Sequence, residues 1–470
     1  MSINHLIKIL PFPVKQSIKY IYGIIPPRIR SGKVFWDTYN FLQESQWWSR
    51  EKLEDYQLQQ LRKLLHHAYD NVPYYRRIFD ERGLKPKDIQ SFDDLKKLPY
   101  LTKEIIRENS PDLVAKNYLR SKLQYITTGG STGMPLGFYQ ERGVANAKEW
   151  AFMVTQWNRI GFKIGDKRII LRGKVVKSAS KGRFWEYDPI DKTLIFSSYH
   201  MTDHTLPNYI KKINDFRPDF LHVYPSAITI LARFMKENNI APFTSVKALL
   251  CGSENLYLWQ RNLLEEVFQC RVYSWYGHSE MTVLAGECEK STNYHIFPEY
   301  GLVELIDNNG NPVSKEEGIG EIVASGFNNY VMPFIRYRTG DIAVYIKEKC
   351  SCGRNYPLLK KVEGRMQEFF VDKAGSLITF IALDYCLWNV KDIINAYQYV
   401  QNEPGKVLLN IDAKRKFSNS DIESVKRTFM EFYSSFYIEI NFVKNIPRTK
   451  SGKFRYLIQK LPIEFANYQK

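Results

Sequence analysis

The sequence has no long hydrophobic run. It contains no stretch of about eighteen consecutive apolar residues, the length that a membrane-spanning helix needs, so no such helix is expected. Its apolar start, MSINHLIKILPFPVK, is interrupted by Pro11 and Pro13 and is followed by no small-residue cleavage site, which argues against a secretory signal. Cysteine is scarce as well. Six cysteines in 470 residues do not make a disulfide scaffold, which favours a reducing, cytoplasmic location.

The sequence also has no recognisable nucleic-acid-binding module, although its formal net charge is +17 at pH 7. Basic residues are interleaved with acidic ones, as in KLEDYQLQQLRKLLHHAYDN, and no long basic tract occurs. This pattern is typical of a solvated mixed surface. The excess positive charge suits anionic partners such as nucleotides, acidic glycans or a membrane surface. We therefore expect no nucleic-acid partner.

The first 50 residues form a basic and apolar arm that has two interpretations. In the first, the arm lies on the inner face of a membrane. The residues that would enter or face the lipid are Leu6, Ile7, Lys8, Ile9, Leu10 and Lys15. In the second, the arm packs on the main body of the protein, and its weak amphipathicity favours this interpretation.

Alternating strand-like and helix-like segments predict a layered α/β fold. From about residue 120 to 340, short apolar runs such as RIIL, FLHVY and VKALLC alternate with helical stretches such as SAITILARFMKENN. In YGLVELIDNNGNPVSKEEGIGEIVASGF, two apolar runs flank a Gly/Asn-rich turn, which predicts a β-hairpin region.

The chain is too long for one compact core, so at least two domains are expected. KVEGRMQEFF reads as a junction, and the sequence after it gives strand, strand, helix, strand and a basic loop. We therefore predict a boundary at Arg365. A large α/β domain with a β-rich subdomain would cover residues 1–365, and a small α+β domain residues 366–470.

The loop in YITTGGSTGMPLGFYQ, residues 125–140, has the composition of a polyphosphate site. Glycines allow close backbone approach and positive φ, successive N–H groups can form an anion nest, and hydroxyls add donors. It is not a P-loop, because G-x-x-x-x-G-K-[ST] is absent. Taken alone, the loop is equally consistent with an ordinary glycine-rich turn.

Three further motifs follow along the chain: SWYGHSEM, RYRTGD and IPRTKSGKFRY. In this order, the four motifs resemble those of the adenylate-forming superfamily, which contains acyl-CoA synthetases, luciferases and peptide-synthetase adenylation domains. HAYDNVPYYRRIFDERGL, LKKLPYLTKEIIREN and YPSAITILARFM are similar to the phenylacetate–CoA ligase branch, especially its capsular-polysaccharide-associated members. The resemblance covers nearly the whole chain.

The resemblance implies that a carboxylate attacks the α-phosphate of ATP and gives an acyl-adenylate and pyrophosphate. It implies that Glu280 positions Mg²⁺, that Tyr276 and Gly277 lie near adenine, and that Asp341 accepts the ribose hydroxyls. Phosphate binding would fall to Thr128, Gly129, Gly130, Ser131, Thr132 and Gly133, with Thr132 also counted as catalytic. The adenine and acyl pocket would be lined by Gly252, Ser253 and Glu254.

The resemblance also implies that Lys453, in the C-terminal PRTKSGK loop, bridges the substrate carboxylate and the α-phosphate. The small C-terminal domain of this family is mobile and swings between two poses, and Arg365 matches the arginine of its junction. Two positions depart from the pattern. Gln367 stands at the hinge, where Asp or Lys is usual, which puts the two-pose cycle in question. Met134-Pro135-Leu136 stands where many relatives have a lysine, so backbone amides and hydroxyls would carry more of the phosphate charge.

The expected activity is ATP-dependent ligation of a carboxylic acid, with either coenzyme A or an amine as acceptor. The capsule-linked resemblance makes an amine or a sugar-borne acid a reasonable partner, in capsule or surface-polysaccharide synthesis. The rival hypothesis is a catalytically degenerate, membrane-surface assembly protein that has kept the fold. The presence of Lys453, Glu280 and Asp341 favours the enzyme. The sequence identifies neither the acid nor the oligomeric state.

Four residues could form a structural zinc site: Cys288, His295, Cys350 and Cys352. Three thiolates and one imidazole complete a tetrahedral zinc shell, and relatives in the resembling branch carry similar cysteines. Their spacing does not establish that they converge, so ordinary reduced cysteines remain the alternative. The other cysteines, in apolar company, are expected in the core: Cys251, Cys270 and Cys386. Packing or surface roles are favoured for His200, His204 and His278 over contacts to substrate.

Overall fold

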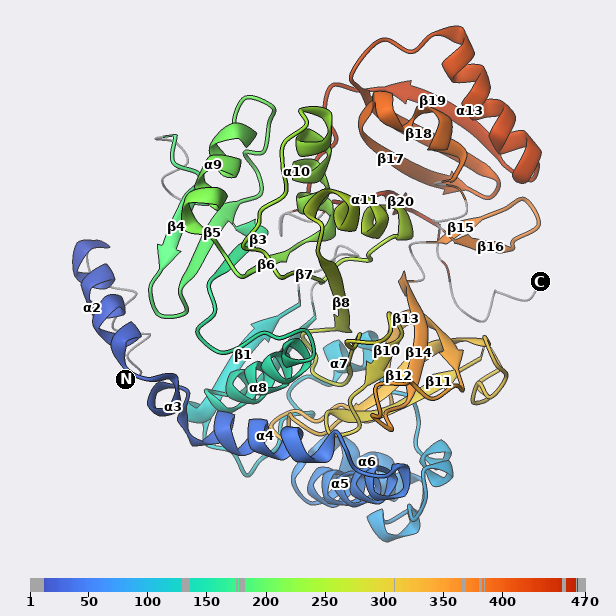
Figure 1. Ribbon diagram of the computed structural model, residues 1–470. Coiled ribbons are helices and arrows are strands. Elements are labelled where there is room, and N and C mark those ends of the chain that lie inside the picture. The colour runs from blue at the N-terminus through green and yellow to red at the C-terminus, as the bar shows by residue number, and fades with distance from the viewer. Residues whose placement is uncertain are drawn as a thin grey trace.

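The structure is a computed structural model (Figure 1). It describes residues 12–128, 136–174, 176, 182–307, 309–365, 369–379, 383, 385–449, 454–461 and 463. Within this part of the chain, the largest element is a twelve-stranded mixed sheet in the order β11-β12-β13-β14-β10-β9-β8-β7-β6-β3-β5-β4. A largely parallel half and an antiparallel half therefore share one continuous sheet.

The parallel half carries the strands that lead to the predicted motifs. Its members are β3 (Arg168–Lys174), β5 (Thr193–Ser197), β6 (Phe220–Val223), β7 (Ala248–Gly252) and β8 (Arg271–Gly277), with β4 (Trp185–Asp188) antiparallel at the edge. Strand β7, ALLCG, is buried at every position. Such a run is typical of a strand covered on both faces.

Helices cover both faces of the parallel half. Leu249 and Cys251 of β7 share a core with α9 (Leu206–Phe216), α10 (Pro225–Glu237) and α11 (Leu258–Phe268). Ala248 and Leu250 of the same strand face the opposite way, where they join a second core. That core is built with α4 (Gly32–Ser45) and α8 (Val144–Asn158). The predicted layered α/β class is confirmed.

The antiparallel half is the predicted β-rich region. Its strands are β9 (Leu284–Gly286), β10 (Tyr294–Ile296), β11 (Gly301–Ile306), β12 (Ile319–Gly326), β13 (Tyr337–Ile346) and β14 (Leu358–Arg365). Strands β11 and β12 pair in antiparallel register, as the Gly/Asn-rich turn between them predicts. A third core joins this region to α5 (Arg50–Asn71), α6 (Pro73–Glu81) and α7 (Lys103–Glu108), and to the hairpin of β1 (Leu123–Thr127) and β2 (Gly137–Glu141).

The C-terminal region has its own sheet and core. The sheet has the order β19 (Tyr437–Phe442), β18 (Lys406–Ala413), β17 (Ile394–Glu403) and β20 (Leu457–Gln459), with α13 (Asn419–Phe432) packed on it. It is preceded by the hairpin of β15 (Phe369–Val371) and β16 (Leu377–Thr379). The sheet lies beside α10 and α11 (Figure 1), and Arg233 of α10 donates to Asn395 O at 3.3 Å. The boundary at Arg365 falls between β14 and β15 and stays a prediction.

The N-terminal arm, as far as the structure describes it, packs on the main body. It contains α2 (Phe12–Ile24) and α3 (Pro27–Arg30). Lys19 pairs with Asp188 at 2.5 Å, and Arg30 donates to the carbonyl of Ile190. The residues proposed to enter lipid, from Leu6 to Leu10, lie outside the described residues, so membrane contact stays a prediction. No helix in the described ranges combines the length and apolarity that crossing a membrane requires.

Candidate active site

The carboxyl ends of the parallel strands gather residues from two of the predicted motifs. Strand β7 ends at Gly252, with Glu254 two residues later, and β8 ends with Tyr276 and Gly277. In open α/β sheets, ligands bind in the crevice outside these strand ends. Strand β13 brings Asp341 to the same place, since Tyr276 donates its hydroxyl to Asp341 Oδ2 at 2.6 Å.

The Tyr276–Asp341 contact joins the predicted adenine and ribose motifs, which are 65 residues apart in sequence. Asp341 is buried, and it follows Gly340, whose φ of 76° lies in the left-handed region that glycine adopts without strain. The Asp341 N–H donates to Thr339 Oγ1 at 3.0 Å. The glycine turn thus fixes the carboxylate beside the tyrosine.

Glu280 is a buried carboxylate that stays ionised. Burial opposes the charge, but His278, the Glu280 backbone N–H and Tyr337 together lower the pKa of Glu280 to about 2. Tyr337 donates its hydroxyl to Glu280 Oε1 at 3.0 Å, and His278 Nδ1 lies 3.1 Å from Oε2. The other ring nitrogen of His278 lies 3.2 Å from Thr282 Oγ1, so this histidine orders the loop, as its favoured packing role requires.

Close packing at the end of β7 requires a glycine. A Cβ on Gly252 would lie 2.4 Å from ring atoms of Trp275 in β8. Ser253, the next residue, has a φ of 69°, which makes a sharp turn before Glu254. Glu254 then accepts hydrogen bonds from the N–H of Ser226 at 3.0 Å and from its hydroxyl at 3.1 Å. Ser226 lies in the first turn of α10, where the helix dipole favours a carboxylate.

The C-terminal basic loop reaches the same carboxylate. Phe454, which follows Lys453 in the sequence, donates its backbone N–H to Glu254 Oε1 at 3.3 Å. Arg448, at the other side of the loop, has its Nη1 3.5 Å from Ser226 Oγ. The two residues lie on either side of Lys453 in the sequence, and both contact the Ser226–Glu254 pair.

Comparisons with known proteins agree with this geometry. Residues 370–460 match the family described as the CapK C-terminal domain. Protein CapK of Staphylococcus aureus is 26% identical over 469 residues, which cover 98% of this chain and 100% of that protein. A phenylacetate–coenzyme A ligase of Thermus thermophilus is 25% identical over 363 residues, 76% of this chain and 80% of the relative. Over most of its length the chain is similar to CapK and to a phenylacetate–coenzyme A ligase.

A solved structure shares the fold of this chain over most of its length. It is 2-hydroxyisobutyryl-CoA ligase in the postadenylation state, in complex with R3-HIB-AMP, with 19% sequence identity and a TM-score of 0.70. The match covers 89% of this chain and 93% of the ligase. The large α/β domain with a smaller C-terminal domain is therefore a fold that the chain shares with this ligase.

Several predicted site residues lie outside the described part of the chain: Gly129, Gly130, Ser131, Thr132, Gly133, Gln367 and Lys453. Arg365 ends β14, and its backbone pairs with Asp341. Thr128 closes one end of the glycine loop, because its N–H donates to Leu136 O at 2.8 Å and its Oγ1 accepts from Leu136 N–H at 2.9 Å. The roles of these residues stay predictions.

Arg172 is a polar residue of the site that the motif search missed. It lies near the carboxyl end of β3, where it donates to Ser253 Oγ and, at 2.6 Å, to His222 Nε2. Burial and the nearby arginine hold the pKa of His222 well below its usual range, so the ring is neutral and accepts this hydrogen bond. Burial lowers the pKa of Arg172, while the nearby Tyr224 and Glu254 favour its charged form. An arginine directly after the apolar run IIL, in RIILRGK, is the signal that could have found it.

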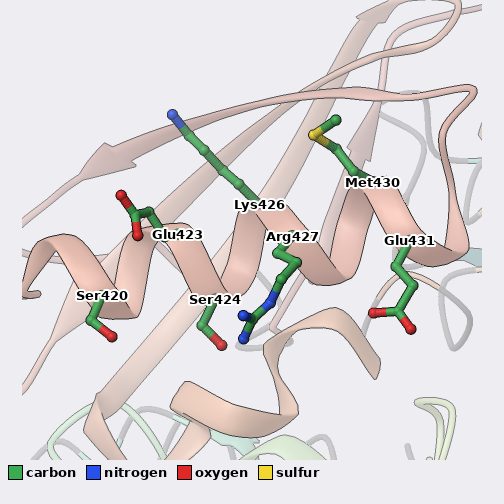
Figure 2. Close-up of a pocket in the computed structure, with 7 residues that line it drawn as sticks. All are labelled: Ser420, Glu423, Ser424, Lys426, Arg427, Met430 and Glu431. Atoms are coloured by element: carbon green, nitrogen blue, oxygen red, sulfur yellow. The ribbon is translucent and has the colours of Figure 1, made fainter.

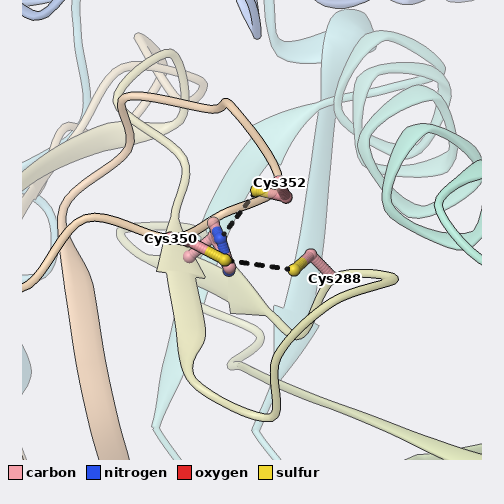
Figure 3. Close-up of side chains that lie close together, drawn as sticks. Cys288, Cys350 and Cys352 are labelled. Carbon is pink, nitrogen blue, oxygen red and sulfur yellow. Dashed lines mark hydrogen bonds between the residues drawn. The ribbon is translucent and has the colours of Figure 1, made fainter.

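The four candidate zinc ligands do converge. Their ligand atoms all lie within 4.8 Å of one another (Figure 3). Of the remaining cysteines, Cys251 and Cys386 are buried as predicted, and Cys270 is half-buried. His200 has Nδ1 2.7 Å from Ser197 Oγ and stacks on Phe184, which fits a packing role, while His204 is exposed.

One surface hollow lies away from this site. It has a volume of about 680 Å³ and lies along α13, between Ser420 and Glu431 (Figure 2). Its lining contains both charge signs and the exposed side chain of Met430, and it includes none of the candidate site residues. We assign it no part in the chemistry.

Proposed function

We propose that the protein is an AMP-forming ligase that activates a carboxylic acid as an acyl-adenylate. A carboxylate oxygen of the acid attacks the α-phosphorus of ATP, the bond to the β,γ-pyrophosphate breaks, and pyrophosphate leaves. A thiol or an amine then attacks the acyl carbon, and AMP leaves. The observation that carries the proposal is the contact of Tyr276 with Asp341 at the strand ends that also hold the Glu280 loop.

The described side chains fit a nucleotide and its metal ion. Asp341 is a carboxylate beside a tyrosine ring, and it can exchange the Tyr276 hydroxyl for the two hydroxyls of a ribose. Glu280 supplies an ionised oxygen donor, the ligand type that Mg²⁺ prefers. Mg²⁺ bound there would offset negative charge on the phosphates. The cysteine cluster takes no part in these steps.

Bringing a carboxylate to a phosphate requires positive charge, because two anions must meet. We assign this role to Lys453, which the C-terminal loop would supply. The contact of the neighbouring Phe454 with Glu254 supports the assignment, since it ties this loop to the strand end after β7. The glycine loop would bind the β- and γ-phosphates through its amides and hydroxyls.

We further propose that Arg172 binds an oxygen of the acid. The guanidinium donates to Ser253 in the pocket loop and stands 5.1 Å from the Tyr224 ring centre. The two printed acceptors of this partly buried guanidinium, Ser253 and His222, are neutral side chains, so its charge favours an anionic or strongly polar substrate group nearby. This favours a polar acid over a purely aliphatic or aromatic one.

Coenzyme A and an amine both remain acceptors in this proposal, and a place in surface-polysaccharide synthesis stays a prediction. A degenerate assembly protein is disfavoured, because a protein that kept only the fold would not need the side chains of Tyr276, Glu280 and Asp341. The test supplies ATP, Mg²⁺ and a library of acids and measures exchange of labelled pyrophosphate into ATP. Adding coenzyme A or amines then identifies the acceptor that releases AMP.

A further inference from the structure

The four candidate ligands lie within or near three adjacent strands. Cys288 comes two residues after β9, His295 is within β10, and Cys350 and Cys352 belong to the loop that precedes β14. In the sheet, β10 lies between β9 and β14. His295 pairs with Gly286 on one side and with Leu358 on the other. The sheet order therefore joins two segments that are 62 residues apart, from Cys288 to Cys350.

The distances between the ligand atoms fit a tetrahedral metal shell. Zinc bonds of about 2.3 Å to sulfur and about 2.0 Å to nitrogen, at tetrahedral angles, place two thiolates about 3.8 Å apart and a thiolate and an imidazole about 3.5 Å apart. Cys288 Sγ lies 3.6 Å from Cys350 Sγ, and Cys352 Sγ lies 3.3 Å from His295 Nε2. Figure 3 shows these two contacts as dashed lines. A disulfide would need about 2.05 Å between sulfurs.

Contacts around the cluster orient the ligands. His295 Nδ1 lies 3.1 Å from the carbonyl of Asn293, so the Nδ1–H donates there and the lone pair of Nε2 is left for a metal. The N–H of Lys290 donates to Cys288 Sγ at 3.3 Å. Arg354, two residues after Cys352, pairs with Glu289 at 2.9 Å and so links the same two loops. Cys288 and His295 are fully buried.

We propose that Cys288, His295, Cys350 and Cys352 bind one structural Zn²⁺ that clamps the β9–β10 turn to the loop before β14. Three soft sulfur ligands with one imidazole match the preference of zinc, and four protein ligands leave no open position for catalysis. The clamped strands are neighbours of the nucleotide site. Ala285 of β9 pairs with Tyr276, and Arg365 of β14 pairs with Asp341, so the metal would hold the two nucleotide-binding strands in place.

The test is metal analysis of the full-length protein, purified under reducing conditions from zinc-containing medium. About one zinc per chain is expected, and cobalt substitution should give the intense visible absorption of a tetrahedral site with thiolate ligands. Cys350→Ser should lose the metal, whereas Cys270→Ser, at a half-buried cysteine outside the cluster, should keep it. A chelator should release the zinc, expose three protected thiols and lower the Tm.

Three results would overturn the proposal without bearing on adenylation. The first is wild-type protein that holds no zinc as purified and takes up none when zinc is added. The second is a disulfide between Cys288 and Cys350 in the native protein, found by mass spectrometry without reductant. The third is a Cys350→Ser protein that keeps its zinc. Because the wild-type measurement decides alone, the test stands even where the variant fails to fold.

Discussion

Replacing Asp341 by Asn should weaken ATP binding about 10- to 100-fold while the protein stays folded. The two side chains have the same shape, and the Tyr276 hydroxyl, now 2.6 Å from Asp341 Oδ2, can still donate to an amide oxygen. The variant loses the charge and one acceptor. A hydrogen bond to a charged group contributes about 1.5–3 kcal/mol, and each 1.4 kcal/mol is tenfold, so losing one such bond gives roughly this range.

The assay is pyrophosphate exchange at varied ATP and saturating acid, with binding of ATP measured by calorimetry. The KM for ATP should rise and the KM for the acid should change little, because the ribose and the acid occupy different parts of the site. Asp215→Asn, a half-exposed carboxylate on α9, is the matched control and should behave as wild type. A KM for ATP within about twofold of wild type, in a D341N protein of unchanged Tm, would refute the ribose assignment.

Three further substitutions test neighbouring parts of the site. Glu280→Gln should raise the Mg²⁺ concentration needed for activity. The pKa of Glu280 in the folded protein, about 2, lies below its ordinary value of 4.5, so the ionised carboxylate stabilises the fold fully above pH 4.5. The variant should therefore have a lower Tm than the wild type at pH 7, and this difference in Tm should shrink as the pH falls from 4.5 toward 2. Gly252→Ala should destabilise the protein by about 1–3 kcal/mol in chemical denaturation, since the new methyl meets the Trp275 ring; an unchanged midpoint would contradict the packing. Arg172→Ala should raise the KM for the acid about tenfold or more and leave the KM for ATP nearly unchanged. Lys212→Ala is the control. Equal effects on the KM values of both substrates would exclude a contact specific to the acid.

Local patterns predicted the layers of the fold well. The structures of the buried run ALLCG and of the turn between β11 and β12 depend on a few consecutive residues. The hydrophobic pattern and the turn residues were therefore sufficient to predict them. The N-terminal arm was different. Its weak amphipathicity left two interpretations open, and only partners far along the chain, such as Asp188 for Lys19, show that residues 12–30 pack on the body.

The site was predictable only as separate motifs. Their resemblance to a family gave roles to Tyr276 and Asp341, but no spacing in the sequence shows that the two side chains meet, because β13 reaches the strand end of β8 through tertiary pairing. Arg172 carries no motif and was missed for the same reason. The cysteine cluster was proposed from its residue types, and its convergence depends on the pairing of β10 with β14, which are not consecutive in the chain.

The most direct test of acid activation is exchange of labelled pyrophosphate into ATP by the wild-type protein and by Lys453→Ala, with an acid that the library identifies. The wild type should catalyse an acid-dependent exchange, and the variant should be slower by about 10²–10³-fold, the usual loss when one group that stabilises transition-state charge is removed. Lys444→Ala, an exposed lysine on the same C-terminal segment, should exchange as the wild type does. Absence of exchange with every acid, or full exchange by the K453A protein, would contradict the proposed function.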